Sequence, residues 1–217
     1  FIMFAAIIFA FVFLPTTPTR TLEDAPLSRP VLDKNLKYLL AIGVIIFTSF
    51  AIFQSVTAYY LQDRFLLSLN ETAKSTALVL GSMAAMSIVS QLTIVQSFKG
   101  SPLRLIWWSI PFFLASSIVI VFSYNFNWVL IGMSLMGLGM GLASPGYTAS
   151  ASLNADKNNQ GAAVGLAMIA PGVGFALGPL LSGFLYQANL TFPFLFTIPL
   201  FLIASFLIFQ LDEKSFQ

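Results

Sequence analysis

Residues 161–186 read GAAVGLAMIAPGVGFALGPLLSGFLY, a stretch without any charged side chain. About 20 helical residues cross a hydrocarbon core roughly 30 Å thick, so this stretch is long enough to span a membrane. In lipid, helices associate through close packing of small residues rather than through the hydrophobic effect. We therefore predict a membrane helix that packs closely on a neighbour. The residues predicted to shape this packing are Gly165, Gly174, Gly178, Pro179 and Gly183.

The composition of the whole chain indicates a protein with several membrane spans. Of its 217 residues, 58% are hydrophobic and only 8% are charged, whereas soluble domains have about 25% charged residues. The net charge of +2 is too small to indicate nucleic acid as a partner. The chain has no cysteine and no histidine. It therefore lacks thiolate metal ligands and the commonest general base, and we expect no metal site, no cofactor and no enzymatic activity.

Hydropathy divides the chain into helices and short polar breaks. Residues 1–14 are expected to be the end of a membrane helix whose beginning is missing, and residues 15–36 a proline-rich polar linker. Residues 37–211 are expected to form one six-helix domain, followed by a polar tail at residues 212–217. The six expected spans are residues 37–62, 73–98, 105–123, 128–153, 161–186 and 190–211.

The distribution of basic residues predicts the orientation of these spans. Of the ten Lys and Arg residues, only Arg64 and Lys74 fall on the side opposite the linker. Cytoplasmic loops of membrane proteins carry the excess of Lys and Arg. We therefore expect the linker and the C-terminus to be cytoplasmic, in a multi-pass protein of the plasma membrane, which here means a bacterial inner membrane.

Two glycine-rich segments resemble the major facilitator superfamily. The spacing from Gly165 to Gly183 resembles that family's antiporter signature, G-x8-G-x3-G-P-x2-G-G, with Ser182 in place of one glycine. Residues 128–153, with several glycines followed by the sequence ASPG, look like the family's tenth helix. The resemblance implies an all-α integral membrane fold. The chain would be the six-helix C-terminal half of a twelve-helix carrier of the drug-efflux branch, and the missing N-terminal half would be its partner.

The same resemblance implies secondary active transport. The expected activity is efflux of small amphipathic compounds by proton antiport, with two halves that alternate access to a site at the bilayer midplane. All eight acidic residues lie in loops or at helix ends, so the proton site is expected in the missing half. Two alternatives stay open, because a fold does not fix a function. One is a nutrient or metabolite carrier on the same fold, and the other is a membrane scaffold that transports nothing.

Aromatic and amide side chains are the candidates for a substrate-binding surface. They recur at helical spacing on several expected spans, and such a surface suits amphipathic or aromatic ligands. The two intramembrane amides are the strongest candidates, because an amide that faces lipid has no hydrogen-bond partner. The alternative for each residue is ordinary packing between helices. The candidates are Phe47, Phe50, Gln54, Thr57, Gln91, Met140, Tyr147 and Phe175.

Overall fold

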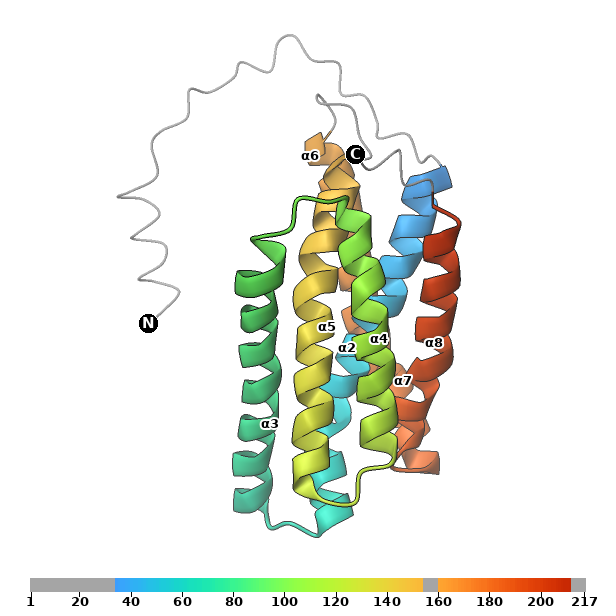
Figure 1. The fold of residues 1–217 in the computed structure, drawn as a ribbon. Coiled ribbons are helices and arrows are strands. Elements are labelled where there is room, and N and C mark those ends of the chain that lie inside the picture. The colour runs from blue at the N-terminus through green and yellow to red at the C-terminus, as the bar shows by residue number, and fades with distance from the viewer. Residues whose placement is uncertain (1–33, 154–159, 212–217) are drawn as a thin grey trace, which may run out of the picture.

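The computed structural model describes residues 34–153 and 160–211, and this part of the chain is an antiparallel bundle of helices (Figure 1). It has six helical spans that are long and apolar enough to cross a membrane, which confirms the predicted all-α membrane fold. The predicted segment 1–14, most of the linker and the tail 212–217 lie outside the described residues. The elements are α2 (Lys34–Phe65), α3 (Leu69–Ser90), the π-helical segment η2 (Gln91–Val95), α4 (Pro102–Val121), α5 (Phe126–Leu153), α6 (Gln160–Ala167), α7 (Ile169–Ala188) and α8 (Phe192–Phe209).

The helices begin and end close to the predicted positions, and the differences have local causes. α3 begins at Leu69 rather than at residue 73 because Ser68 and Glu71 form a capping box. The Ser68 hydroxyl accepts a hydrogen bond from the Glu71 amide, and the Glu71 carboxylate accepts one from the Ser68 amide at 2.9 Å. The expected span at 161–186 is interrupted between α6 and α7, at Met168.

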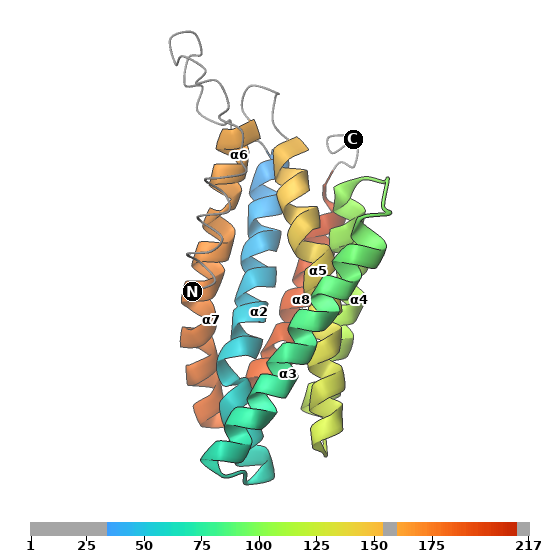
Figure 2. The ribbon, with the colours of Figure 1, turned by 90° about the vertical axis from the view of Figure 1, so that its left-hand side faces the viewer.

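α2 and α5 form the middle of the bundle (Figures 1 and 2). α2 packs mainly on α7 and α8, whereas α5 packs mainly on α4 and α3. The largest fully buried side chains include Phe53 and Tyr60 of α2 and Phe113 of α4. The rings of Phe53 and Tyr60 both meet Phe194 of α8 edge-on, with centroids 5.1 Å apart.

The glycines of α5 let two neighbouring helices approach its backbone. Gly139 lies against the ring of Phe113 in α4, where an added Cβ would come within 2.5 Å of that ring. On another face, a Cβ at Gly137 would overlap the Met83 carbonyl of α3. Glycine is therefore required at both positions for the observed packing, in agreement with the role of small residues between membrane helices.

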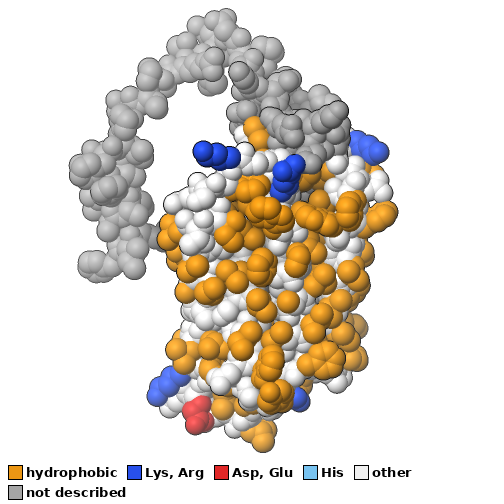
Figure 3. All heavy atoms as spheres, in the orientation of Figure 1, with side chains coloured by type: hydrophobic (Ala, Val, Ile, Leu, Met, Phe, Trp, Pro, Cys, Tyr) orange, Lys and Arg blue, Asp and Glu red, His pale blue; other side chains and the backbone are white. Residues whose placement is uncertain are grey.

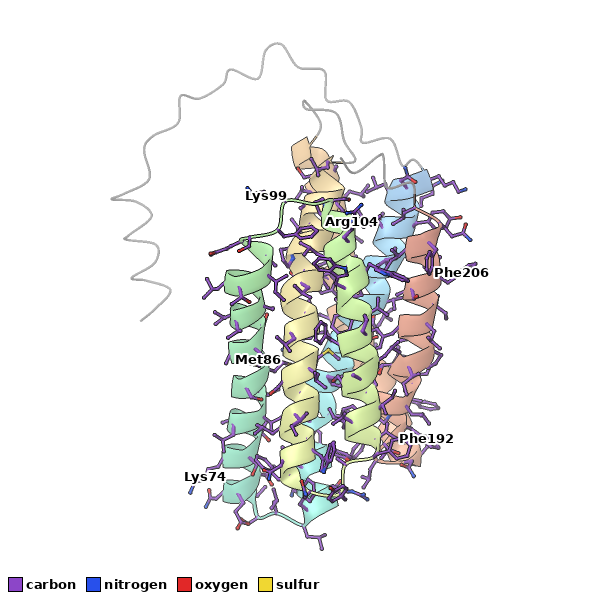
Figure 4. The ribbon with its side chains drawn as sticks, viewed as in Figure 1. Lys74, Met86, Lys99, Arg104, Phe192 and Phe206 are labelled. Atoms are coloured by element: carbon purple, nitrogen blue, oxygen red, sulfur yellow. The ribbon has the colours of Figure 1, made fainter. Side chains whose placement is uncertain are left out.

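The surface of the bundle has an apolar middle and charged ends. Hydrophobic side chains cover most of the face in Figure 3, and Lys or Arg side chains lie at both ends. Among the described residues, Lys99 and Arg104 lie at one end and Lys74 at the other (Figure 4). The only described acidic residues, Asp63 and Glu71, lie at the same end as Lys74. The apolar middle is what a bilayer would cover.

Candidate functional site

Four of the predicted binding residues come together as an aromatic cluster formed by Phe47, Phe50, Tyr147 and Phe175. They come from three helices, α2, α5 and α7. The ring centroids are 5.7 Å apart for Phe47 and Tyr147, 6.5 Å for Phe47 and Phe175, and 6.2 Å for Phe50 and Phe175. These separations are within the range in which aromatic rings stabilise each other.

The cluster lies at mid-depth and is open on one side. α2 has 32 residues, which at ~1.5 Å per residue makes it about 48 Å long, and Phe50 lies near its middle. Phe47 is buried, but Phe175 is 45% exposed. Gln54 follows Phe50 by one helical turn and is exposed as well. Together these side chains offer apolar ring surface and one amide, which can both donate and accept hydrogen bonds.

Tyr147 is the most deeply buried member of the cluster, and it contacts the break between α6 and α7. Pro171 has no N–H, so it cannot donate the usual helical hydrogen bond to the carbonyl of Ala167. The Tyr147 hydroxyl donates to that carbonyl instead, at 2.8 Å. The Tyr147 ring also fills the space beside Gly43 of α2. At 1% exposure, Tyr147 therefore positions α6 and α7 rather than offering surface to a ligand.

Two other predicted residues, Thr57 and Met140, are buried between helices and do not join the aromatic cluster. Thr57 is 1% exposed; its hydroxyl donates to the Phe53 carbonyl and lies 3.9 Å from the sulfur of Met133 in α5. Met140 is also a core residue. Thr57 lies on the same face of α2 as Phe50, two helical turns further along the helix. At that position Met133 of α5 packs on α2 and covers Thr57. Spacing along one helix cannot reveal that coverage.

Gln91 is exposed but lies away from the cluster. It begins the π-helical segment η2, in which the Gln96 amide donates to the Gln91 carbonyl at 3.1 Å. α2 and α3 run antiparallel, and at ~1.5 Å per residue the depths of Gln54 and Gln91 differ by about 16 Å. The structure therefore places the two amides at different depths. π-Helical turns are frequent at functional positions, and nothing in the sequence pattern indicated this one.

The glycine signature contains a tight seam between α2 and α7, formed by Gly174, Gly178 and Ser182. A Cβ at Gly174 would lie 2.7 Å from Cβ of Phe47, and one at Gly178 would lie 3.0 Å from the Thr48 carbonyl. The Oγ atoms of Ser182 and Ser55 are 2.8 Å apart, a hydrogen bond between the helices. The residue that departs from the signature therefore contributes a polar link to the seam.

The other predicted positions of the signature lie outside this seam. No atom lies within 4 Å of a Cβ added at Gly165 or Gly183, apart from their own helix. Pro179 is exposed. Among the described positions of the signature, close packing on α2 therefore occurs at Gly174, Gly178 and Ser182, which are spaced four residues apart.

A pair of side chains that the sequence did not connect joins α2 and α7 at the opposite end from Lys99. The Tyr186 hydroxyl donates to the Asp63 carboxylate at 2.7 Å, and the rings of Tyr186 and Tyr59 are 6.3 Å apart. Asp63 and Tyr186 were both expected near helix ends, but no spacing rule pairs side chains on separate helices. Within the described residues, no three His, Cys, Asp or Glu side chains are placed to hold a metal ion.

Comparison with known proteins identifies the family and the fold. The sequence profile described as Major Facilitator Superfamily matches residues 1–170 and 100–215. A crystal structure of a mutant form of the peptide transporter POT superposes with a TM-score of 0.68 at 15% sequence identity, and the match covers 84% of this chain. This chain spans 39% of the length of that transporter. No curated protein matches the sequence. Because the profile covers nearly the whole chain, this protein belongs to the Major Facilitator Superfamily.

Proposed function

We propose that this chain is the C-terminal half of a secondary transporter that exports small amphipathic compounds in exchange for protons. The observation that carries the proposal is the aromatic cluster, which is open at Phe175 near the middle of the span and has the exposed amide of Gln54 beside it. Substrate sites of such carriers lie at this depth. Aromatic faces also attract organic cations, a common form of amphipathic compound.

The position of the charges supports a proton site outside this half. Asp63 and Glu71, the acidic residues that the structure describes, lie at the ends of α2 and α3. An intramembrane acidic residue marks a proton relay in many carriers, and the described spans offer none at the depth of the cluster. We expect the acidic residue that couples transport to protons in the N-terminal half of the carrier.

The exposure of α3 and α7 supports a second helical bundle, the N-terminal half of the carrier, as the partner of this chain. α3 and α7 are the least buried of the six spans, although both are strongly apolar. In the proposed carrier they pack on the N-terminal half, and the two halves rock about the aromatic cluster. The tight seam makes α7 move together with α2, because a glycine contact of this kind leaves no room for sliding. The end that carries Lys99 is expected to be cytoplasmic.

The direction of proton-driven flux tests this function. The whole carrier is reconstituted into liposomes, and the movement of ethidium and of a labelled dipeptide is followed under an imposed pH gradient. The proposal expects ethidium to move against the proton flux and the dipeptide not to move. Dipeptide movement with the protons would instead support a nutrient carrier, an alternative that the similarity to the peptide transporter fits equally well. Absence of any flux over a broad panel of compounds would support the scaffold.

A further inference from the structure

A groove between α4 and α8 lies apart from the aromatic cluster. It has a volume of about 470 Å³, and its lining includes Arg104, Trp107, Trp108 and Phe209. The rings of Trp107 and Phe209 meet edge-on across it, with centroids 4.5 Å apart. The groove is at the end of the bundle that also carries Lys99 (Figure 4). The α2 rings that meet Phe194 of α8 are those of Phe53 and Tyr60, which are not members of the aromatic cluster.

The groove opens on the surface that a bilayer would cover. Phe209 is 74% exposed, and Phe206 and Leu202, which precede it on α8, are exposed too. Arg104 lies in the first turn of α4 and Phe209 ends α8, so the groove is at the level where a span leaves the hydrocarbon core. Tryptophan is enriched at this level, because its ring is apolar and its N–H needs a polar partner.

The described charged side chains at this end of the bundle favour an anionic ligand. Its described charged residues are Lys34, Lys37, Lys99 and Arg104, and the described acidic residues are at the other end. A guanidinium has five N–H donors, so Arg104 can bind a phosphate group in addition to a partner within the protein. Basic grooves between membrane helices at the cytoplasmic surface are suited to anionic lipid head groups.

We infer that this groove binds one anionic phospholipid from the leaflet at the Lys/Arg-rich end. Arg104 holds the phosphate, and the rings of Trp107 and Phe209 contact the upper part of an acyl chain. The inference is independent of the proposed transport function, since none of these residues belongs to the aromatic cluster. The lipid would join α4 to α8 at this end of the bundle, where its head group can remain in the interface.

The tryptophans of the chain provide a direct test. There are three tryptophans, and Trp128, at the other end of the bundle, is the one that does not line this groove. In a Trp128→Phe background, the fluorescence of this chain therefore comes from the groove. The chain is reconstituted into bilayers of unlabelled phosphatidylcholine that contain brominated phosphatidylglycerol or brominated phosphatidylcholine, and quenching gives the relative binding constant of the two head groups.

We expect phosphatidylglycerol to bind about fivefold better than phosphatidylcholine, which corresponds to the ~1 kcal/mol that one basic residue near the surface contributes. Arg104→Gln should bring the ratio to about one, and Arg104→Lys should retain most of it. Lys37→Gln is the matched control, because it removes the same charge at the same end but from α2, outside the groove. It should leave the ratio unchanged.

Three results would overturn the inference. The first is equal binding of the two head groups in the unmodified groove. The second is an equal loss of preference in Arg104→Gln and Lys37→Gln, because that would indicate general attraction to the charged end. The third is quenching that appears only after residues 212–217 are removed, because that would make the C-terminal tail of the chain the occupant of the groove.

Discussion

Tyr147 is the residue on which the geometry of the candidate site depends most. Its hydroxyl satisfies the Ala167 carbonyl that Pro171 leaves without a helical donor. Its ring contacts Phe47 and lies on Gly43, so one side chain connects α2, α5 and the break between α6 and α7. A buried carbonyl without a donor costs about 1–3 kcal/mol. Loss of the Tyr147 hydroxyl should therefore change the free energy of unfolding by a measurable amount.

We predict that Tyr147→Phe lowers the stability of the chain by about 1–3 kcal/mol, because the Ala167 carbonyl is buried and would lose its donor. Thermal unfolding in detergent measures the change. Pro171→Ala restores a backbone N–H at the position that can donate to the same carbonyl. The loss caused by Tyr147→Phe should therefore be smaller in the Pro171→Ala background. Tyr124→Phe, at an exposed ring, is the control. Equal losses in both backgrounds would contradict this role of Tyr147.

At the same scale, the sequence singled out aromatic residues that the structure brings together, but not what each of them does. Phe47, Phe50 and Phe175 were chosen for aromatic character and spacing, and these properties can be read from a sequence. The burial of Thr57 and the hydrogen bond of Tyr147 depend on how α5 crosses α2 and on where the helix breaks. These depend on tertiary packing, so a pattern along one helix could not reveal them.

Among the elements, α7 is the one whose packing the sequence describes best. The signature places small residues where α7 meets α2, and the structure has close backbone approach at Gly174 and Gly178. The pattern did not distinguish these positions from Gly165 and Gly183, because all four are glycines in one apolar helix. It also did not place the break at Met168, three residues before Pro171. The six spans themselves were predictable, since length and hydropathy determine them.

We predict that Gly178→Leu destabilises the chain by about 1–3 kcal/mol, since the new side chain would overlap Ala51 and the Thr48 carbonyl of α2. Gly183→Leu is the matched control, because it is the same substitution on the same helix at a position with open space around it. It should change the unfolding temperature little. Equal destabilisation by the two variants would show that the seam has no special role in packing.

For the whole molecule, the charged ends predict an orientation in the membrane. The chain has no cysteine, so single cysteines can be introduced without background labelling. Ser97 is exposed at the end that carries Lys99, and Asn125 and Asn189 are exposed at the other end. We expect Ser97→Cys to react with an impermeant maleimide only from the cytoplasm, and Asn125→Cys and Asn189→Cys only from outside. Labelling of Ser97→Cys and Asn189→Cys from the same side would contradict the six-span arrangement.

In the proposed carrier the aromatic cluster contacts the transported compound, and the efflux of ethidium by cluster variants of the whole carrier tests this contact most directly. Phe175→Ala is compared with Phe184→Ala, which removes an exposed ring from the same helix outside the cluster. Aromatic contacts contribute about 0.5–1.5 kcal/mol each. At equal protein levels we therefore expect Phe175→Ala to slow efflux roughly three- to tenfold, and Phe184→Ala to match the unmodified carrier. Unchanged efflux in Phe175→Ala, or equal losses in both variants, would contradict the proposed contact.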